Sequence, residues 1–355
     1  MGEAVRNLYV HFPFCRRKCT YCALHSRAGT TPEVRADYVA RMAEAVAQIF
    51  PATAAGHELS TIYFGGGSPA LCDLGPLMDT LRPLRAPDCE FTVELHPLDV
   101  TPDVLKSLKN GGVNRISMGV QSLDDGILAH MGRGYGFYEA ERAFGLVREH
   151  FDNAGIDLIV GYPEETSALT PRHARLAKWG LRHCSVYSLI LEERSALGAR
   201  IRSRQTKPDE LPSDDVVMNR ISTVARFMED IGLRRYEISN YAAPGFECRH
   251  NIATWSGEDY VGLGDGAHGR IGLERTRNFG GESPESETVS EESDRKERSI
   301  FRLRTRLGLD TSDKPEWRAA LDKFASEGLL EKRGTLYRLT ERGTEVCDSI
   351  LAELV

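Results

Sequence analysis

Residues 8–26 read LYVHFPFCRRKCTYCALHS. The first five letters alternate between apolar and polar, which predicts a β-strand over 8–12. Cys15, Cys19 and Cys22 follow this strand within eight residues. Three thiols so close together predict a metal site in the loop after the strand.

The number of thiols separates two kinds of metal site. Structural zinc takes four ligands, and His11 or His25 could supply the fourth. A [4Fe–4S] cluster can use three thiolates, one on each of three irons, which leaves the fourth iron open to a ligand from solution. The Cys-x3-Cys-x2-Cys spacing favours the cluster, and zinc stays open as the alternative.

Downstream of this loop, strand and helix patterns alternate. The predicted strands cover 8–12, 59–67, 90–95, 113–120, 155–163 and 184–191. The predicted helices cover 33–49, 101–112 and 137–150, and the second begins with a capping threonine and a proline. Six strands separated by helices predict an α/β fold with a parallel sheet, a partial (βα)6 TIM-like barrel over 1–200.

Polar and glycine-rich motifs follow the ends of these strands. The cysteines follow the first strand, GGGSP (65–69) follows the second, and Glu94 closes the third. Because parallel strands of a barrel end at the same face, we expect these groups to meet there.

The second half of the chain divides into three further segments. Residues 201–280 are predicted to close the barrel. Residues 281–298 are rich in charge and almost free of large apolar residues, which predicts an acidic polar loop or linker. Residues 299–355 read as a helix, a hairpin turning near Gly334 and a final helix, which predicts a winged-helix-like α+β module. This module has ten basic and ten acidic residues, so no DNA-binding footprint is expected.

The overall composition excludes several classes of protein. The chain has 355 residues and a net charge of −7, which disfavours nucleic acid as a partner. No apolar run approaches the roughly 18 residues of a membrane helix, and no signal peptide is recognisable, so a cytoplasmic location is expected. The five scattered cysteines are expected to be small buried hydrophobic residues rather than a disulfide framework.

The cysteine loop resembles the signature of the radical S-adenosylmethionine (SAM) superfamily, with Tyr21 directly before the last cysteine. The wider string YVHFPFC (9–15) resembles the subgroup of oxygen-independent coproporphyrinogen III oxidases and HemW-type heme chaperones. The resemblance implies that the three cysteines hold a [4Fe–4S] cluster and that SAM binds its fourth iron. One electron from the cluster would then cleave SAM to a 5′-deoxyadenosyl radical.

The same resemblance implies a set of SAM contacts at the strand ends. Glycines let a backbone approach a ligand closely, and a carboxylate at a strand end suits a ribose diol. Taken singly, these residues could equally form a tight turn or a surface charge. The residues assigned to SAM are Tyr9, Tyr21, Gly66, Gly67, Ser68, Glu94, Gln121, Arg133 and Asp157.

Two features separate the members of the subgroup. The oxidase has a further cysteine where this chain has Leu24, and it has a longer segment before the position of Tyr9. The strings 236–251 and 259–269 also resemble the HemW type. Within the first, HNIATW (250–255) resembles an HNxxYW motif proposed for heme contact, although Thr254 replaces its tyrosine. This implies that His250 contacts heme. The alternative is that His250 only hydrogen-bonds within a loop that closes the barrel, and His11 is expected to be a hydrogen-bonding core residue.

The predicted function is therefore binding of heme and its transfer to apoproteins, including respiratory ones. The expected partners are heme or porphyrin and those apoproteins, with transient membrane-protein contact and without nucleic acid. The alternatives are decarboxylation of coproporphyrinogen III, another radical SAM reaction such as methyl transfer or heme breakdown, and a zinc protein. No catalytic residue is assigned, and the sequence does not indicate the client or the oligomeric state.

Overall fold

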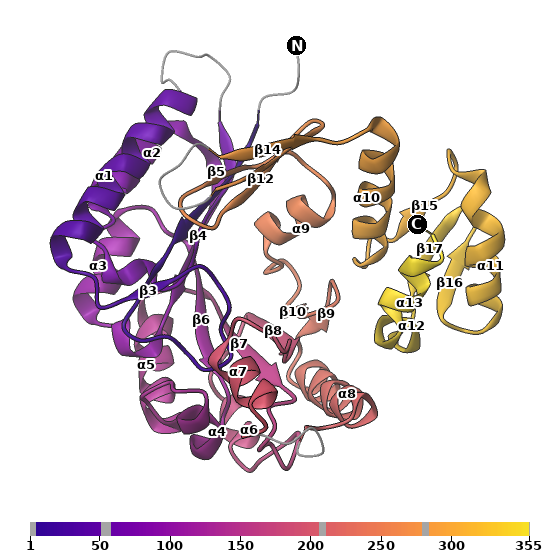
Figure 1. Cartoon of the computed structure of the whole chain (residues 1–355), viewed down its shortest axis with the longest axis horizontal. Coiled ribbons are helices and arrows are strands. Elements are labelled where there is room, and N and C mark those ends of the chain that lie inside the picture. Colours follow the sequence, from indigo (N-terminus) through magenta and orange to yellow (C-terminus); the bar gives the residue numbers. More distant parts are fainter. Residues whose placement is uncertain (1–4, 51–57, 206–210, 279–283, 355) are drawn as a thin grey trace.

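A nine-stranded, mostly parallel sheet dominates the computed structural model, which describes residues 5–50, 58–205, 211–278 and 284–354 (Figure 1). Six of its strands are parallel and lie side by side in chain order. They are β1 (Asn7–Phe12), β4 (Leu59–Gly66), β5 (Arg85–Leu95), β6 (Arg115–Gln121), β7 (Asn153–Val160) and β8 (His183–Ser188). All six strands predicted from the sequence are thereby confirmed, although the last two end at Val160 and Ser188 rather than at 163 and 191.

Helices connect successive strands, as a parallel sheet requires. The three predicted helices are present as α1, α3 and α5, and Thr31 and Thr101 accept hydrogen bonds that cap the first two. The helices that precede β9 in the chain are α1 (Pro32–Ile49), α2 (Gly75–Leu81), α3 (Pro102–Asn110), α4 (Asp125–His130), α5 (Phe137–His150), α6 (His173–Leu176), α7 (Ala196–Arg202) and α8 (Asp214–Asp230). Figure 1 shows α1, α2, α3 and α5 along one side of the strands.

The two faces of the sheet differ in polarity. Side chains on the helix-covered face, such as Val10, Ile62 and Val93, are fully buried in the main hydrophobic core. Because side chains alternate along a strand, Tyr9, Tyr63 and Glu94 and their counterparts on β6 to β8 point to the opposite face. The candidate functional residues share this polar inner face.

Short strands extend both edges of the sheet without joining them. At one edge β11 (Val261–Leu263) pairs parallel with β1. At the other edge β10 (Asn240–Ala242) pairs antiparallel with β8, and β9 (Arg234–Arg235) pairs with β10. The sheet is therefore open, with β11 and β9 at its two ends. The helix α9 (Arg249–Trp255) lies on the inner side of the strands (Figure 1).

The prediction of a polar loop or linker over 281–298 is wrong for the part that the structure describes. Residues 285–288 form strand β14 (Glu285–Thr288), which joins β12 (His268–Ile271) and β13 (Glu274–Arg277) in an antiparallel sheet. Residues from 291 onward form helix α10 (Glu291–Leu303). One charged residue of the segment is buried and paired, since Asp294 accepts hydrogen bonds from Arg270, Arg275 and Arg298, whereas others such as Glu285 and Glu291 are exposed.

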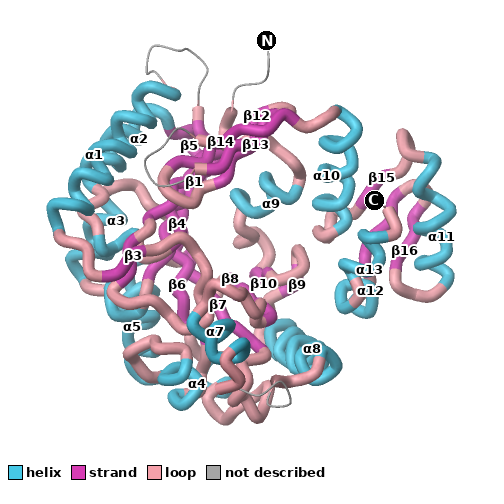
Figure 2. Tube along the Cα trace, in the orientation of Figure 1, coloured by secondary structure: helices cyan, strands magenta, loops and turns pink. Residues whose placement is uncertain are grey.

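Figure 2 shows helices and short strands side by side in the C-terminal unit. This unit has a second hydrophobic core, which includes Leu303, Leu321, Tyr337 and Ile350. The predicted order of helix, hairpin and helix is confirmed, but the final helix is divided in two around Val346. The elements are β15 (Leu309–Asp310), α11 (Arg318–Ser326), β16 (Leu330–Arg333), β17 (Leu336–Leu339), α12 (Glu341–Glu345) and α13 (Cys347–Ala352). Their strands form a small antiparallel sheet. Across the described ranges, no helix combines the length and apolar character needed to cross a bilayer.

Candidate functional site

The cysteine loop is anchored at the carboxyl edge of the sheet. Cys15 ends the short strand β2 (Phe14–Cys15), which pairs with β3 (Arg27–Ala28). Between the other two cysteines, the Thr20 N–H donates to the Met131 carbonyl at 3.1 Å, and its carbonyl accepts from the Leu197 N–H at 2.7 Å. The loop is thus tied to α4 and α7. All three cysteines are free and partly buried.

The donor set of this loop fits an iron–sulfur cluster. Burial raises the pKa of the Cys15 and Cys22 thiols, and the Arg133 Nη1 lies 3.2 Å from the Cys19 Sγ. A guanidinium in that position stabilises a thiolate, which is the form that binds iron. In the described part of the chain, no three His, Cys, Asp or Glu side chains gather into a single-ion site.

Both ring nitrogens of His11 form hydrogen bonds within the protein, as the sequence predicts. Its Nε2 donates to the His25 carbonyl at 2.9 Å, so its Nδ1 is the acceptor for the Tyr9 hydroxyl at 3.1 Å. The ring is 3% exposed, and burial lowers its pKa. With both nitrogens bound in this way, His11 is not a free fourth ligand for zinc.

The GGGSP turn holds the chain that leads into the cysteines. The Gly67 and Ser68 N–H groups donate to the Phe12 and Phe14 carbonyls at 2.8 and 2.7 Å. A Cβ at Gly67 would lie 2.4 Å from the Phe14 oxygen, so only glycine allows this approach. The Ser68 hydroxyl donates to Asp99, which also binds Arg16 of the cysteine loop.

Glu94 lies at the centre of the polar inner face. Its carboxylate accepts hydrogen bonds from the Tyr63 hydroxyl at 2.8 Å and the Gly66 N–H at 3.0 Å. Burial, followed by the charge of Asp157, raises its pKa to about 7. The structure therefore brings the predicted glycine turn and the predicted carboxylate into direct contact.

Strand β6 and the segment after it supply a second group of predicted residues. Arg133 donates to the Gly119 carbonyl at 2.6 Å and the Tyr135 hydroxyl at 2.9 Å, in addition to Cys19. Gln121 ends the strand with a φ of 70°, a conformation that non-glycine residues rarely adopt outside functional sites. On β7, Asp157 accepts from the Ser117 hydroxyl at 3.1 Å, and burial raises its pKa.

The two predicted tyrosines occupy different surroundings. Tyr9 stacks on Tyr63 with ring centroids 5.9 Å apart, on the inner face. Tyr21 packs against the small apolar cluster that contains Ile127, Met131 and Leu197. Tyr21 thus supports the cysteine loop, and Tyr9 lies deeper among the strands.

His250 lies at the other end of the strands. Its Nδ1 is 2.8 Å from Thr61 Oγ1, near the start of β4, and its ring is 5.2 Å from Tyr63. The Thr61 hydroxyl donates to Asn7 Oδ1, so it accepts from His250 Nδ1 and leaves Nε2 as the atom with a lone pair. The ring is 6% exposed, and burial followed by Arg115 lowers its pKa to about 3. Of the predicted SAM residues, His250 contacts Tyr9, on which its ring stacks with centroids 6.4 Å apart.

Trp255, at the end of the same motif, faces away from His250. Its ring packs on Phe301 at 5.6 Å, and the Arg304 guanidinium lies 5.3 Å above it. The histidine and tryptophan of HNIATW therefore belong to different environments, one in the sheet interior and one against α10.

Sequence reasoning missed Tyr63, Asp99 and Ser117, which hold the predicted residues in place. Tyr63 and Ser117 occupy inner-face positions of strands predicted from the sequence, so strand alternation would have identified both. Asp99 follows β5 in a turn and has no comparable signal.

Comparison with known proteins identifies the family. The model of the radical SAM superfamily matches residues 9–177. The heme chaperone HemW of Escherichia coli is 32% identical, with 97% of both chains covered. This chain belongs to the HemW family.

A second HemW relative agrees with this assignment, and one solved structure shares the fold. HemW of Mycobacterium tuberculosis is 30% identical over 98% of this chain and 94% of its own. The structure of E. coli coproporphyrinogen III oxidase, a radical SAM enzyme, matches 99% of this chain and 90% of that chain with a TM-score of 0.81 and 21% identity. At this identity the likeness concerns the fold. Membership of the radical SAM superfamily implies a [4Fe–4S] cluster and SAM, and the cysteine loop of this HemW family member has the matching donor set.

Proposed function

We propose that this chain binds heme and transfers it to apoproteins. The observation that carries the proposal is the relation to heme chaperone HemW of E. coli, which extends over 97% of both chains. In this proposal Cys15, Cys19 and Cys22 hold a [4Fe–4S] cluster. SAM is bound at the carboxyl edge by Tyr9, Tyr21, Gly66, Gly67, Ser68, Glu94, Gln121, Arg133 and Asp157.

The bound cluster supplies one-electron chemistry, and the protein's own groups bind and shield it. Arg133 places positive charge beside the Cys19 thiol at 3.2 Å. Glu94 and Asp157 present two carboxyl groups to a diol or an ammonium group, and Glu94 can take up or release a proton near neutral pH. Gly66 has a positive φ, and its N–H donates to Glu94. A ligand bound at the Glu94 carboxylate would therefore also contact the GGGSP turn.

Heme handling is favoured over coproporphyrinogen decarboxylation by the cysteine loop itself. Leu24 stands where the oxidase has a cysteine, and its side chain is 53% exposed. An exposed leucine offers apolar contact and no thiol, which suits a binding role rather than that reaction.

His250 is proposed as an iron ligand. Its neutral ring, with the lone pair on Nε2, is the form that binds heme iron. The ring is buried against Tyr63 and Thr61, so ligation requires α9 to move away from β4.

The wider predictions belong to the same proposal. The parallel sheet is interpreted as a partial (βα)6 TIM-like barrel over 1–200, with 201–280 as an extension that adds strands to both of its open edges and 299–355 as a winged-helix-like module. The proposed setting is cytoplasmic, with respiratory apoproteins as clients.

Anaerobic reconstitution followed by heme titration tests the proposal. We expect broad iron–sulfur absorbance that is lost in Cys19→Ala and kept in Cys72→Ala, a cysteine outside the loop. The heme-loaded protein should transfer heme to apomyoglobin. A colourless zinc-loaded protein, absence of heme binding, or turnover of coproporphyrinogen III with SAM and a reductant would contradict the proposal.

A further inference from the structure

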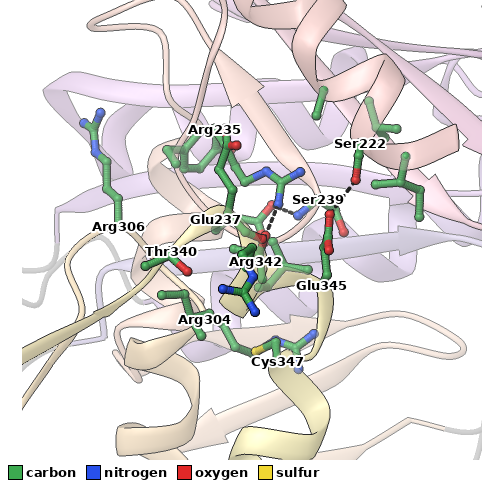
Figure 3. A pocket seen from close by; sticks show the side chains of 18 of the residues that line it. Ser222, Arg235, Glu237, Ser239, Arg304, Arg306, Thr340, Arg342, Glu345 and Cys347 are labelled. Carbon is green, nitrogen blue, oxygen red and sulfur yellow. Dashed lines mark hydrogen bonds between the residues drawn. The ribbon is translucent and has the colours of Figure 1, made fainter. Parts of the chain in front are cut away.

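A cavity of about 920 Å³ lies between the edge of the large sheet and the C-terminal unit (Figure 3). Its walls come from α8, from residues 234–239 at the β9–β10 edge, and from residues 339–349 of the C-terminal unit. The string YEIS (236–239), which the sequence comparison relates to the HemW type, contributes four consecutive lining residues. The SAM group and α9 have no part in these walls.

Direct contacts hold the walls of the cavity together. The Ser222 hydroxyl of α8 donates to Glu345 of α12 at 2.6 Å, a contact drawn in Figure 3. The Arg306 N–H donates to the Tyr236 carbonyl at 2.9 Å. The cavity is thus an open cleft between elements that are hydrogen-bonded to each other.

Among the described residues, four of the lining arginines have no carboxylate within 4 Å, namely Arg226, Arg234, Arg235 and Arg342, and the last two come from facing walls. Arg235 donates to the Thr344 hydroxyl at 2.5 Å and to the Tyr241 hydroxyl, both neutral groups. The one partner found for Arg342 is the Glu327 carbonyl, at 3.5 Å. Within the described ranges, neither guanidinium has a carboxylate within 4 Å, whereas Arg304 is paired with Asp348. Arg235 comes from the sheet edge and Arg342 from α12, so two cations without a directly paired carboxylate come from different walls. Glu229 and Glu237 lie close enough to Arg235 to interact with its charge.

Acidic residues also line the cavity, so its charge is not uniformly positive. Glu229 and Glu341 lie near each other, and burial together with the charge of Glu341 raises the pKa of Glu229. Recognition would therefore depend on where each arginine lies rather than on an overall positive field.

The rest of the lining has serine and threonine hydroxyls and an apolar part that suits a hydrophobic body. The apolar part includes Ile221, Ile238, Leu339 and Val346. Ligand cavities commonly measure about 300–1,000 Å³ and combine apolar walls with a few charged groups. A ligand that fills this cavity should have an apolar plane and two anionic groups.

We propose that this cavity binds the tetrapyrrole, with its two propionates paired to Arg235 and Arg342. The inference rests on the proposed heme-binding function and deepens it by naming a binding site. The planar guanidinium forms paired hydrogen bonds to a carboxylate. His250 does not line the cavity, so this site and iron ligation by His250 predict different effects of mutation.

Fluorescence titration with iron-free protoporphyrin IX separates these effects, because no iron ligand is involved. We expect Arg342→Gln, at an exposed residue, to weaken porphyrin affinity roughly tenfold, and the double variant with Arg235→Gln to weaken it further. Arg333→Gln, at an exposed arginine of the same unit outside the cavity, should leave the affinity unchanged. The dimethyl ester of the porphyrin should bind the wild type and the variants equally.

A second variant protects the test against misfolding. Val346→Trp, at a lining residue that is 40% exposed, narrows the cavity without removing a charge. It should also weaken porphyrin binding, with thermal unfolding unchanged. Unaltered affinity in Arg342→Gln and Val346→Trp would overturn the cavity proposal while leaving heme binding intact. If Arg342→Gln loses transfer to apomyoglobin but keeps its porphyrin affinity, the cavity proposal is overturned. That result would indicate that the cavity binds an acidic segment of a partner protein instead. A wild type that binds neither porphyrin nor heme would overturn both proposals.

Discussion

Glu94 shows at the scale of one residue how the sheet interior changes ordinary chemistry. Its carboxyl group is surrounded by Tyr63, Gly66 and Asp157, and its pKa is raised to about 7 from the usual 4.5. The folded chain therefore holds this proton more tightly than the unfolded chain. The resulting stabilisation is complete below about pH 4.5 and is lost as the pH rises through 7.

Replacing Glu94 with glutamine should remove this pH dependence. We expect the free energy of unfolding of the wild type without SAM to fall, relative to Glu94→Gln, by at most roughly 3 kcal/mol between pH 4.5 and 7.5. Urea unfolding of both proteins at several pH values measures the difference, because other groups contribute equally to both. Parallel pH profiles would show that Glu94 titrates normally.

Gly66 is required both for its backbone angle and for the space beside it. Its φ is 105°, and an added Cβ would lie 2.6 Å from the His11 ring. We expect Gly66→Ala to cost roughly 2–4 kcal/mol of unfolding free energy, because strain and a steric clash add. Gly245→Ala is the matched control, with a φ of 86° and no atom within 4 Å of the added Cβ. It should cost only about 1 kcal/mol, and equal losses in the two variants would mean that the contact with His11 is relieved at no cost.

At the scale of elements, α9 and α10 connect the sheet to the C-terminal unit. His250 on α9 enters the sheet interior, while Trp255 on the same helix packs on Phe301 of α10. Asp294 then ties α10 to the β12–β14 sheet through Arg270 and Arg275. These contacts convert a charged segment of sequence into packed structure.

Asp294→Asn should release this connection. Removing one partner from a largely buried charge network costs about 3–5 kcal/mol, since the arginines lose their counter-charge. We expect faster limited proteolysis within 284–298 in the variant, with little change for Glu292→Gln, an exposed residue on the same helix. Equal cleavage rates in wild type and Asp294→Asn would mean that the helix is held by other contacts.

At the scale of the whole molecule, two separate hydrophobic cores predict two units of local stability. Leu321 is fully buried in the C-terminal core and Leu77 is fully buried in the core beside the sheet. Leu321→Ala should lower amide protection in the C-terminal unit by about 2–5 kcal/mol and leave β4 to β6 protected. Leu77→Ala should have the reverse effect. Hydrogen exchange by mass spectrometry distinguishes the two, and uniform loss of protection in both variants would indicate a single cooperative unit.

Local patterns were sufficient to predict much of the fold. The alternating strand residues, the capping Thr101 and the helix spacing of 33–49 depend on neighbours in the chain, so sequence reasoning found them. The prediction of a polar loop over 281–298 was wrong for the opposite reason. Its helix and strand are stabilised by Arg270 and Arg275, which lie on other strands and leave no local signal.

By itself the sequence determined the order of six strands and their helices, the three-cysteine loop at the end of the first strand, and the chemistry expected there. These features depend on spacing along the chain. Only the tertiary structure decided that Glu94 meets Gly66 and Tyr63, that His250 and Trp255 face different surroundings, and that Arg235 and Arg342 line one cavity. Contacts of this kind join residues far apart in sequence, and the packing of the folded chain alone brings them together.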